Sequence, residues 1–207
     1  MTPLRLRLLG TVSLVPLLAC LSASLPKATA PDLYVLDPPL PRGAAAADGA
    51  PGLIVLAPVR ASPGLEGSGM VYVRREHEVG YFARSAWVEP PARMLAPLLA
   101  RALELGGSFQ VVRDAAGAAP ARLRLETDVV RLQQEFTERP SLVRLVLHVR
   151  LIDATARRVL GDKEIEVVEP APRDDAYGGV LAANAAAARA LADVAAACAG
   201  WARAAPR

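Results

Sequence analysis

The chain has 207 residues, of which 53% are hydrophobic, 22% are charged and only 4% are aromatic. This length suits one domain with a substantial core, and the low aromatic content predicts a core built mainly from leucine, valine and alanine. The formal net charge is +3 and falls to +1 without the first nineteen residues, which carry two of the 24 basic groups and leave 22 against 21 acidic ones. This near balance excludes electrostatically driven binding to nucleic acid.

The first nineteen residues have the layout of a bacterial signal peptide. Arg5 and Arg7 form a short basic start, and residues 8–18 form an apolar stretch that is too short for an ordinary transmembrane helix. The tetrapeptide Leu-Leu-Ala-Cys that ends at Cys20 resembles the bacterial lipobox, in which the cysteine is acylated and becomes the first residue. We therefore expect residues 1–19 to be removed and Cys20 to carry a lipid anchor, in preference to a simply cleaved signal or an uncleaved anchor.

The resemblance to lipoproteins also indicates a membrane. Two or more acyl chains on one cysteine give stable attachment to a bilayer. Leu21 follows the cysteine, whereas the enterobacterial signal for inner-membrane retention is an aspartate at that position. The expected location is therefore the outer membrane, with the domain facing the periplasm.

Residues 20–51 are rich in proline, alanine and glycine, and we predict a lipidated N-terminus followed by a flexible tether. Only residues 33–36 interrupt this composition with a short strand-like segment. The domain itself is expected at residues 52–204. Its first apolar run, 53–59, does not alternate, which predicts a central strand covered on both faces.

A hairpin and a helix are predicted next. Residues 70–74 and 79–82 read as two strands that flank a charged turn. A helix is predicted to begin at Pro90-Pro91 and to stop at Gly106-Gly107, because apolar residues recur between them at spacings of three and four. Pro97 predicts either a kink in this helix or a later start.

Four strands and a long helix complete the prediction. The strands are expected at 109–112, 123–136, 142–152 and 158–168, and alternation in the last two predicts an antiparallel meander with one wet face and Arg–Glu pairs across strands. From Asp174 an alanine-rich helix is expected to dock on the sheet through Tyr177, Leu181, Ala188, Leu191, Ala195, Cys198 and Trp201. The predicted fold class is α+β with two layers: a mixed, largely antiparallel sheet with two main helices packed on it.

Few residues suggest chemistry. The sequence Glu76-His77-Glu78 and the lone His148 are interpreted as a solvated turn and a surface histidine rather than metal ligands. Glu126 and Asp128 share a strand face with Arg124, which favours an ion-pair cluster over a catalytic pair. The other small candidates are interpreted structurally: Gly64, Gly67 and Gly69 as turn residues, and Cys198 as a buried side chain without a disulfide partner once Cys20 is acylated. We expect no catalytic residue, metal or cofactor, and therefore a binding or scaffolding protein rather than an enzyme.

The order of motifs between residues 53 and 103 suggests a family. An apolar strand ends at Pro58, Met-Val-Tyr-Val-Arg follows at 70–74, Val-Gly-Tyr-Phe at 79–82, and a tryptophan at position 87 leads into the first helix. This layout, with the lipobox, the meander and the late tryptophan, resembles the ABC-type transport auxiliary lipoprotein family, which includes the paraquat-inducible lipoprotein of an intermembrane lipid-transport operon. The loop 60–69 departs from the expected pattern, because it has Gly-Leu-Glu-Gly at 64–67 where relatives often carry Leu-Asp-Arg.

The resemblance implies a function beside an ABC transporter. The partners would be a substrate-binding protein with mammalian-cell-entry (MCE) domains and its ABC permease and ATPase, which move phospholipid or another hydrophobic molecule between the two membranes. The lipoprotein would act by docking, and the residues that match the family motif are Tyr72, Arg74, Tyr81 and Trp87. Tyr81 and Trp87 have a structural alternative, which is to pack the first helix onto the sheet.

Two other functions remain open at this stage. The same anchor and tether suit an envelope lipoprotein that activates or assembles another periplasmic machine, such as cell-wall synthesis. A periplasmic hydrolase would need an acid, base or nucleophile set, and the sequence does not display one.

Overall fold

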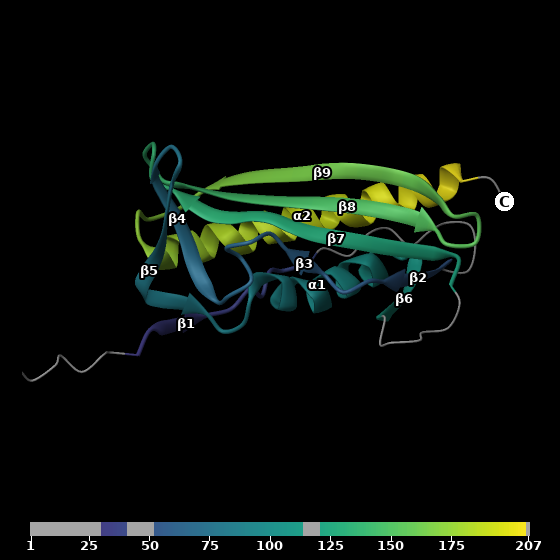
Figure 1. Cartoon of the computed structure of the whole chain (residues 1–207), viewed down its shortest axis with the longest axis horizontal. Helices are drawn as coiled ribbons and strands as arrows, with labels where there is room; N and C mark the ends of the chain where they lie inside the picture. The colour runs from purple at the N-terminus through teal and green to yellow at the C-terminus, as the bar shows by residue number, and fades with distance from the viewer. Residues whose placement is uncertain (1–29, 41–51, 114–120, 206–207) are drawn as a thin grey trace, which may run out of the picture.

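The computed structural model describes residues 30–40, 52–113 and 121–205. In this part of the chain a mixed nine-stranded sheet carries two helices on one of its faces (Figure 1). The predicted α+β class, with two main helices packed on a mixed sheet, is confirmed. In chain order the elements are β1 (Asp32–Tyr34), β2 (Gly52–Leu56), β3 (Arg60–Ala61), β4 (Gly69–Arg75), β5 (Glu78–Trp87), α1 (Pro91–Leu105), β6 (Phe109–Arg113), β7 (Leu123–Glu135), β8 (Leu142–Asp153), β9 (Arg158–Pro170) and α2 (Ala176–Ala204).

Strand β7 organises the sheet. One of its edges pairs antiparallel with β8 along nearly its whole length, from Leu123 to Glu135. Its other edge is shared by three short strands in succession, because β2, β3 and β4 each pair with it in parallel. Strand β6 then extends the sheet beyond β2, and β5 and β1 extend it beyond β4.

The predicted antiparallel meander is present as β7, β8 and β9. In β8 the residues predicted to point inward are almost fully buried: Val143, Leu145, Leu147, Val149 and Leu151. The side chains between them project from the opposite face, as expected for a strand period of two. We call this opposite face, which faces away from both helices, the outer face of the sheet.

Helix α1 begins and ends where the sequence predicts. Pro91 occupies its first turn, and Gly107 follows the end with a φ of 71°, which glycine adopts without strain. Pro97 lies inside the helix on its exposed side, so the helix does not start later. Its apolar face packs against β6 and α2.

Helix α2 packs along β8 and β9 over its 29 residues, and the carboxylate of Asp175 caps its first turn by accepting a 2.7 Å hydrogen bond from the Gly178 amide. The predicted apolar stripe is only partly correct. Leu191 and Cys198 are fully buried, but Tyr177 and Leu181 are exposed. Small residues of α2 pack against the sheet instead. Three of them have no exposed surface: Ala186, Ala187 and Ala190.

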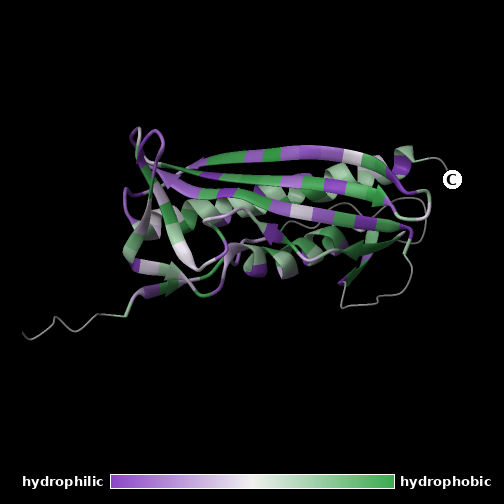
Figure 2. Ribbon diagram, in the orientation of Figure 1, coloured by the Kyte–Doolittle hydropathy of each residue, from purple (hydrophilic) through white to green (hydrophobic). Residues whose placement is uncertain are grey.

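Figure 2 shows that α2 is apolar over most of its visible length. By length and composition α2 is the one described helix that could cross a membrane. Its packing on the sheet, with several fully buried residues, accounts for this composition as that of a core helix.

Part of the predicted tether lies on the domain. The short strand suggested at residues 33–36 is present as β1, which pairs in parallel with β5. Leu36 is buried, and Asn184 of α2 holds the segment by accepting a 2.7 Å hydrogen bond from the Asp37 amide. Residues 30–40 are therefore part of the folded domain and not of a free tether. The rest of the predicted tether, 20–29 and 41–51, lies outside the described residues.

Candidate functional site

The outer face of the sheet carries clusters of charged side chains that are paired with one another. No described helix covers it, and Figure 2 shows polar and apolar residues alternating along the three long strands. Alternation along each strand places the charged side chains of neighbouring strands side by side on this face.

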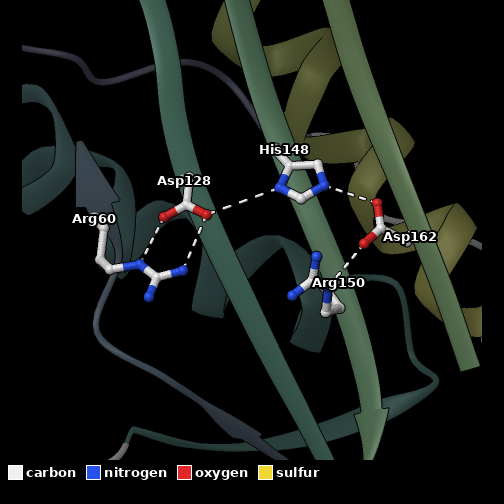
Figure 3. Close-up of polar contacts among 5 residues, drawn as sticks. All are labelled: Arg60, Asp128, His148, Arg150 and Asp162. Carbon is white, nitrogen blue, oxygen red and sulfur yellow. Dashed lines mark hydrogen bonds and ion pairs between the residues drawn. The ribbon is translucent and has the colours of Figure 1, made fainter. Parts of the chain in front are cut away.

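A row of five charged or titratable residues crosses the outer face (Figure 3). Arg60 on β3 binds both carboxylate oxygens of Asp128 on β7, at 2.7 and 3.1 Å. His148 on β8 lies between two carboxylates, with Nδ1 3.8 Å from Asp128 and Nε2 2.7 Å from Asp162 on β9. Arg150 donates a 2.7 Å hydrogen bond to the other oxygen of Asp162. We call these five residues the charged row.

A second cluster lies further along β8 towards β4. Arg144 donates to both oxygens of Glu135 on β7, at 2.8 and 3.0 Å, and also pairs with Glu166 on β9. The predicted Arg–Glu pairs across strands are therefore confirmed.

These contacts hold the carboxylates in their charged form. The hydrogen bond from Arg60 is the main cause that lowers the pKa of Asp128, and the bond from Arg144 lowers the pKa of Glu135 in the same way. Asp162 also has a lowered pKa, first because of Arg150 and then because of His148. A general acid needs the opposite shift. The lowered pKa values thus argue against Asp128, Glu135 and Asp162 as general acids.

The predicted ion-pair cluster around Asp128 is confirmed, with a partner that the sequence did not suggest. Asp128 binds Arg60, whereas Glu126 lies 3.8 Å from Arg124. Arg60 and Asp162 were missed. Asp162 belongs to the alternating pattern of β9 and could have been found from it, but Arg60 lies in a short strand whose pairing with β7 has no local signal.

The other candidate ligands form a turn. Glu78 pairs with Arg75 across the β4–β5 turn, and His77 has a φ of 65° within it. Among the residues that the structure describes, no group of three or more His, Cys, Asp or Glu side chains is arranged to hold a metal ion.

Two of the four motif residues stabilise the β4–β5 hairpin. The Tyr72 ring packs edge-on against Phe82, with 5.0 Å between ring centroids, and also contacts Phe136. Arg74 is exposed, and its guanidinium lies 5.0 Å from the centre of the Tyr72 ring. Gly80 is required beside this ring, because a Cβ there would lie 2.6 Å from it.

Tyr81 is exposed and yet fixed in place. Its side chain is on the same face as Val79, and 51% of the residue is exposed. The hydroxyl donates a 3.0 Å hydrogen bond to the Gly64 carbonyl, and the ring lies so close to Gly69 that a Cβ would be 2.7 Å away. The predicted turn role of Gly64 is confirmed by its φ of 92°. Tyr81 thus presents a rigid aromatic surface.

Trp87 is a core residue. Only 4% of it is exposed, and it packs between the sheet and α2 together with Met70, Leu132 and Ala183. Its burial leaves no surface for direct contact with a partner, so the packing alternative applies to Trp87, and residues of α2 lie beside it.

Comparison with known families identifies the chain. Residues 34–196 match the model of the ABC-type transport auxiliary lipoprotein component. The chain belongs to this family. The match covers most of the auxiliary lipoprotein and includes the segment after β1 that composition alone had assigned to a tether. A search of curated protein sequences found no match.

Solved structures share the fold of the auxiliary lipoprotein. It is similar to protein XCC0632 from Xanthomonas campestris, with a TM-score of 0.71 and 15% identity over 83% of this chain and 96% of that one. It is also similar to the hypothetical protein CT253 from Chlamydia trachomatis, with a TM-score of 0.55 and 11% identity over 75% of this chain and 100% of that one. At these identities the similarity establishes the fold alone.

Proposed function

We propose that this auxiliary lipoprotein is anchored in the outer membrane through acylated Cys20 and docks an ABC transporter whose substrate-binding protein carries MCE domains. The complex would move phospholipid or another hydrophobic molecule between the two membranes, and the lipoprotein would contribute binding rather than catalysis. Family membership supports a role beside an ABC-type transporter. Cys20 lies outside the described residues, so the anchor rests on the lipobox.

The observation that carries the docking role is the continuity of the outer face. Val73 of β4 pairs with Glu135 of β7 on one side and with Val79 of β5 on the other, so Val79 and Tyr81, which share the side of Val73, extend the face that bears the ion pairs. Protein interfaces combine such a polar surround with a few aromatic or arginine anchors.

Tyr81 is the best candidate for such an anchor. Its ring is already held by Gly64 and Gly69, so little conformational entropy remains to be lost when a partner binds. Arg74 is exposed and stacked on Tyr72, but alternation along β4 places both on the side opposite to Val73, so Arg74 is a second candidate only at the edge of the hairpin.

The test is affinity capture of the full-length lipoprotein from its native envelope. We expect an MCE-domain protein and its ABC permease to be recovered with the wild type. Tyr81→Ala should reduce their recovery by about tenfold or more, as expected for an interface anchor. Tyr81→Phe keeps the ring and should reduce it less. Arg101→Ala, at an exposed position on α1 and therefore off the outer face, is the control.

Two outcomes would contradict the proposal. Unchanged recovery with Tyr81→Ala and Arg74→Ala would remove the hairpin from the interface. Recovery of cell-wall enzymes in place of an ABC transporter would favour the alternative of an envelope lipoprotein that assembles another machine. Separately, Cys20→Ala should release the protein from the outer-membrane fraction, which tests the anchor alone.

A further inference from the structure

An apolar patch lies around β1, which is the described strand nearest in sequence to Cys20. Five of the nine large hydrophobic residues exposed in the described part of the chain belong to it, and between 43% and 62% of each is exposed. We call these five the apolar patch: Leu33, Val35, Val88, Tyr177 and Leu181.

Three separate segments that lie side by side contribute to the patch. Strand β1 lies on β5, and the Val88 amide donates a 2.8 Å hydrogen bond to the Tyr34 carbonyl. The ring of Tyr34 lies 6.1 Å from that of Tyr177 on α2. Asn184 binds both the Val35 carbonyl and the Asp37 amide, which fixes the chain after β1 alongside α2.

An open hollow of about 420 Å³ lies further along the same side of α2. Pro39, Leu40, Ala188 and Ala192 line it together with Arg189, whose guanidinium is paired with Glu169. The apolar surface therefore extends for several turns of the helix, beyond the size of an isolated exposed side chain.

Chain length brings this surface to a membrane if Cys20 is acylated. Ala30, the first described residue, follows Cys20 by ten positions. Ten residues span at most about 36 Å when fully extended. Ala30 is thus confined to within that distance of the bilayer that holds the lipid, and Leu33 of the patch follows Ala30 by only three positions.

The polar groups at its rim fit the boundary between lipid headgroups and acyl chains. Arg173 lies over the Tyr177 ring, 5.3 Å from its centre, and an aromatic ring with a cation at its edge suits this layer. Asp32 and Asp37 also lie at the rim, and Asp175 neutralises Arg173 at 3.0 Å. The patch therefore suits an uncharged bilayer surface rather than a strongly anionic one.

We propose that the apolar patch rests on the surface of the bilayer in which Cys20 is anchored, and so fixes the orientation of the domain on the membrane. The inference relies on the anchor of the proposed function. With the patch on the membrane, the β8–β9 turn at the opposite end of the long axis points away from it (Figure 1).

The experiment uses the full-length lipoprotein in phosphatidylcholine vesicles that contain a lipid-borne nitroxide quencher. A fluorophore is attached to Val35→Cys in one sample and to Val159→Cys in another, both at exposed positions. Cys198 is fully buried and Cys20 is blocked if acylated, so each chain carries one label. We expect several-fold stronger quenching at position 35 than at position 159, at low and high salt alike.

A double variant tests the patch itself. Leu33→Glu with Leu181→Glu should abolish the quenching at position 35 while the protein stays on the vesicles, and Leu53→Glu, which is exposed elsewhere, should not. Equal quenching at positions 35 and 159 in anchored protein would overturn the proposal and leave the anchor intact. The proposal would also be overturned if, without lipid, the label at position 35 became shielded as the protein concentration rose. A second copy of the chain would then cover the patch.

Failure of the anchor is recognised separately. A second label per chain would show that Cys20 is free, which contradicts the anchor of the proposed function. In that case vesicle flotation tests whether the patch binds the membrane without the anchor. Binding that is lost with Leu33→Glu and Leu181→Glu would support membrane contact by the patch. No binding by the wild type would contradict both the patch contact and the anchor.

Discussion

At the scale of single residues, the outer face is a set of carboxylates held by arginines. Arg60 and Arg144 each make two hydrogen bonds to one carboxylate, and such paired geometry fixes the relative position of neighbouring strands. Since these groups are partly exposed, each pair contributes modestly to stability, and their arrangement matters more for the shape and charge of the surface.

The lowered pKa of Glu135 predicts a loss of stability in acid. A carboxyl whose pKa is lower in the folded state stabilises the fold above its ordinary value of 4.5, and this stabilisation is lost as the pH falls through the lowered folded pKa. The urea concentration at the midpoint of unfolding should therefore decrease as the pH is lowered from 5 to 3. Arg144→Gln should lower the midpoint at pH 7 and flatten this acid dependence, because it removes the main cause of the shift.

The control for the acid prediction is Arg101→Gln, at an exposed position on α1. It should leave both the midpoint at pH 7 and the acid dependence unchanged. A steep acid dependence that persists in Arg144→Gln would show that other carboxyls, such as Asp153, dominate.

Gln134 links β7 to the start of α2. Its side chain is buried and donates hydrogen bonds to Ser141 Oγ at 2.9 Å and to the Asp175 carbonyl at 3.2 Å. Gln134→Leu should lower the free energy of unfolding by about 1–3 kcal/mol, because it removes two hydrogen bonds that join β7 to Ser141 and to the start of α2. Gln133→Leu, on the outer face, should cost less than about 1 kcal/mol. An equal decrease in the free energy of unfolding for the two variants, measured by urea unfolding, would contradict this role of Gln134.

At the scale of elements, the small residues of α2 decide how closely the helix approaches the sheet. Ala186, Ala187 and Ala190 have no exposed surface, so the helix lies on β8 and β9 with no space for larger side chains. The large apolar residues at its N-terminal end, Tyr177 and Leu181, are displaced to the solvent side. This arrangement contributes Tyr177 and Leu181 to the apolar patch.

Ala187→Leu should destabilise the protein by about 1–3 kcal/mol, because added methylene groups in a filled core force the helix or its neighbours to move. Ala185 lies on the exposed side of α2, and Ala185→Leu should change stability by less than about 0.5 kcal/mol. Calorimetric melting of the two variants compares them directly. A similar loss in both would mean that the helix itself, and not its packing, is sensitive.

At the scale of the whole molecule, two surfaces of different chemistry lie on largely different elements and share only β5. The outer face is polar and belongs to β7, β8 and β9 with the β4–β5 hairpin, whereas the apolar patch belongs to β1, the end of β5 and α2. This separation would allow one molecule to contact a membrane and a protein partner at the same time.

Cys198 offers a measure of opening of the whole domain. Burial raises the pKa of its thiol to about 12, and only the thiolate reacts rapidly with alkylating reagents. In a Cys20→Ala background we expect negligible alkylation at pH 8 in water, and a rate that rises with the unfolded fraction in urea when followed by mass spectrometry. Rapid alkylation without urea would show that α2 detaches locally from the sheet.

The sequence by itself predicted most of the elements and the turn roles around them. Helix α1, the hairpin β4–β5 and the meander β7–β9 lie close to their predicted positions, because periods of 3.6 and two, and proline and glycine at the ends, are local signals. It also predicted the buried Cys198 and the pairing of arginine with glutamate on the outer face, and its order of motifs indicated the family that the comparison confirmed.

Tertiary structure alone decided which segments meet. Arg60 and Asp128 are 68 positions apart and come together only because β3 shares an edge of β7 with β2 and β4. The placement of β1 on β5, the burial of Trp87 and the exposed side of α2 likewise depend on parallel pairings and close helix packing between distant segments. Such contacts leave no periodic trace in the chain, since the hydrophobic pattern of a strand indicates which of its faces is buried but not which distant strand it pairs with.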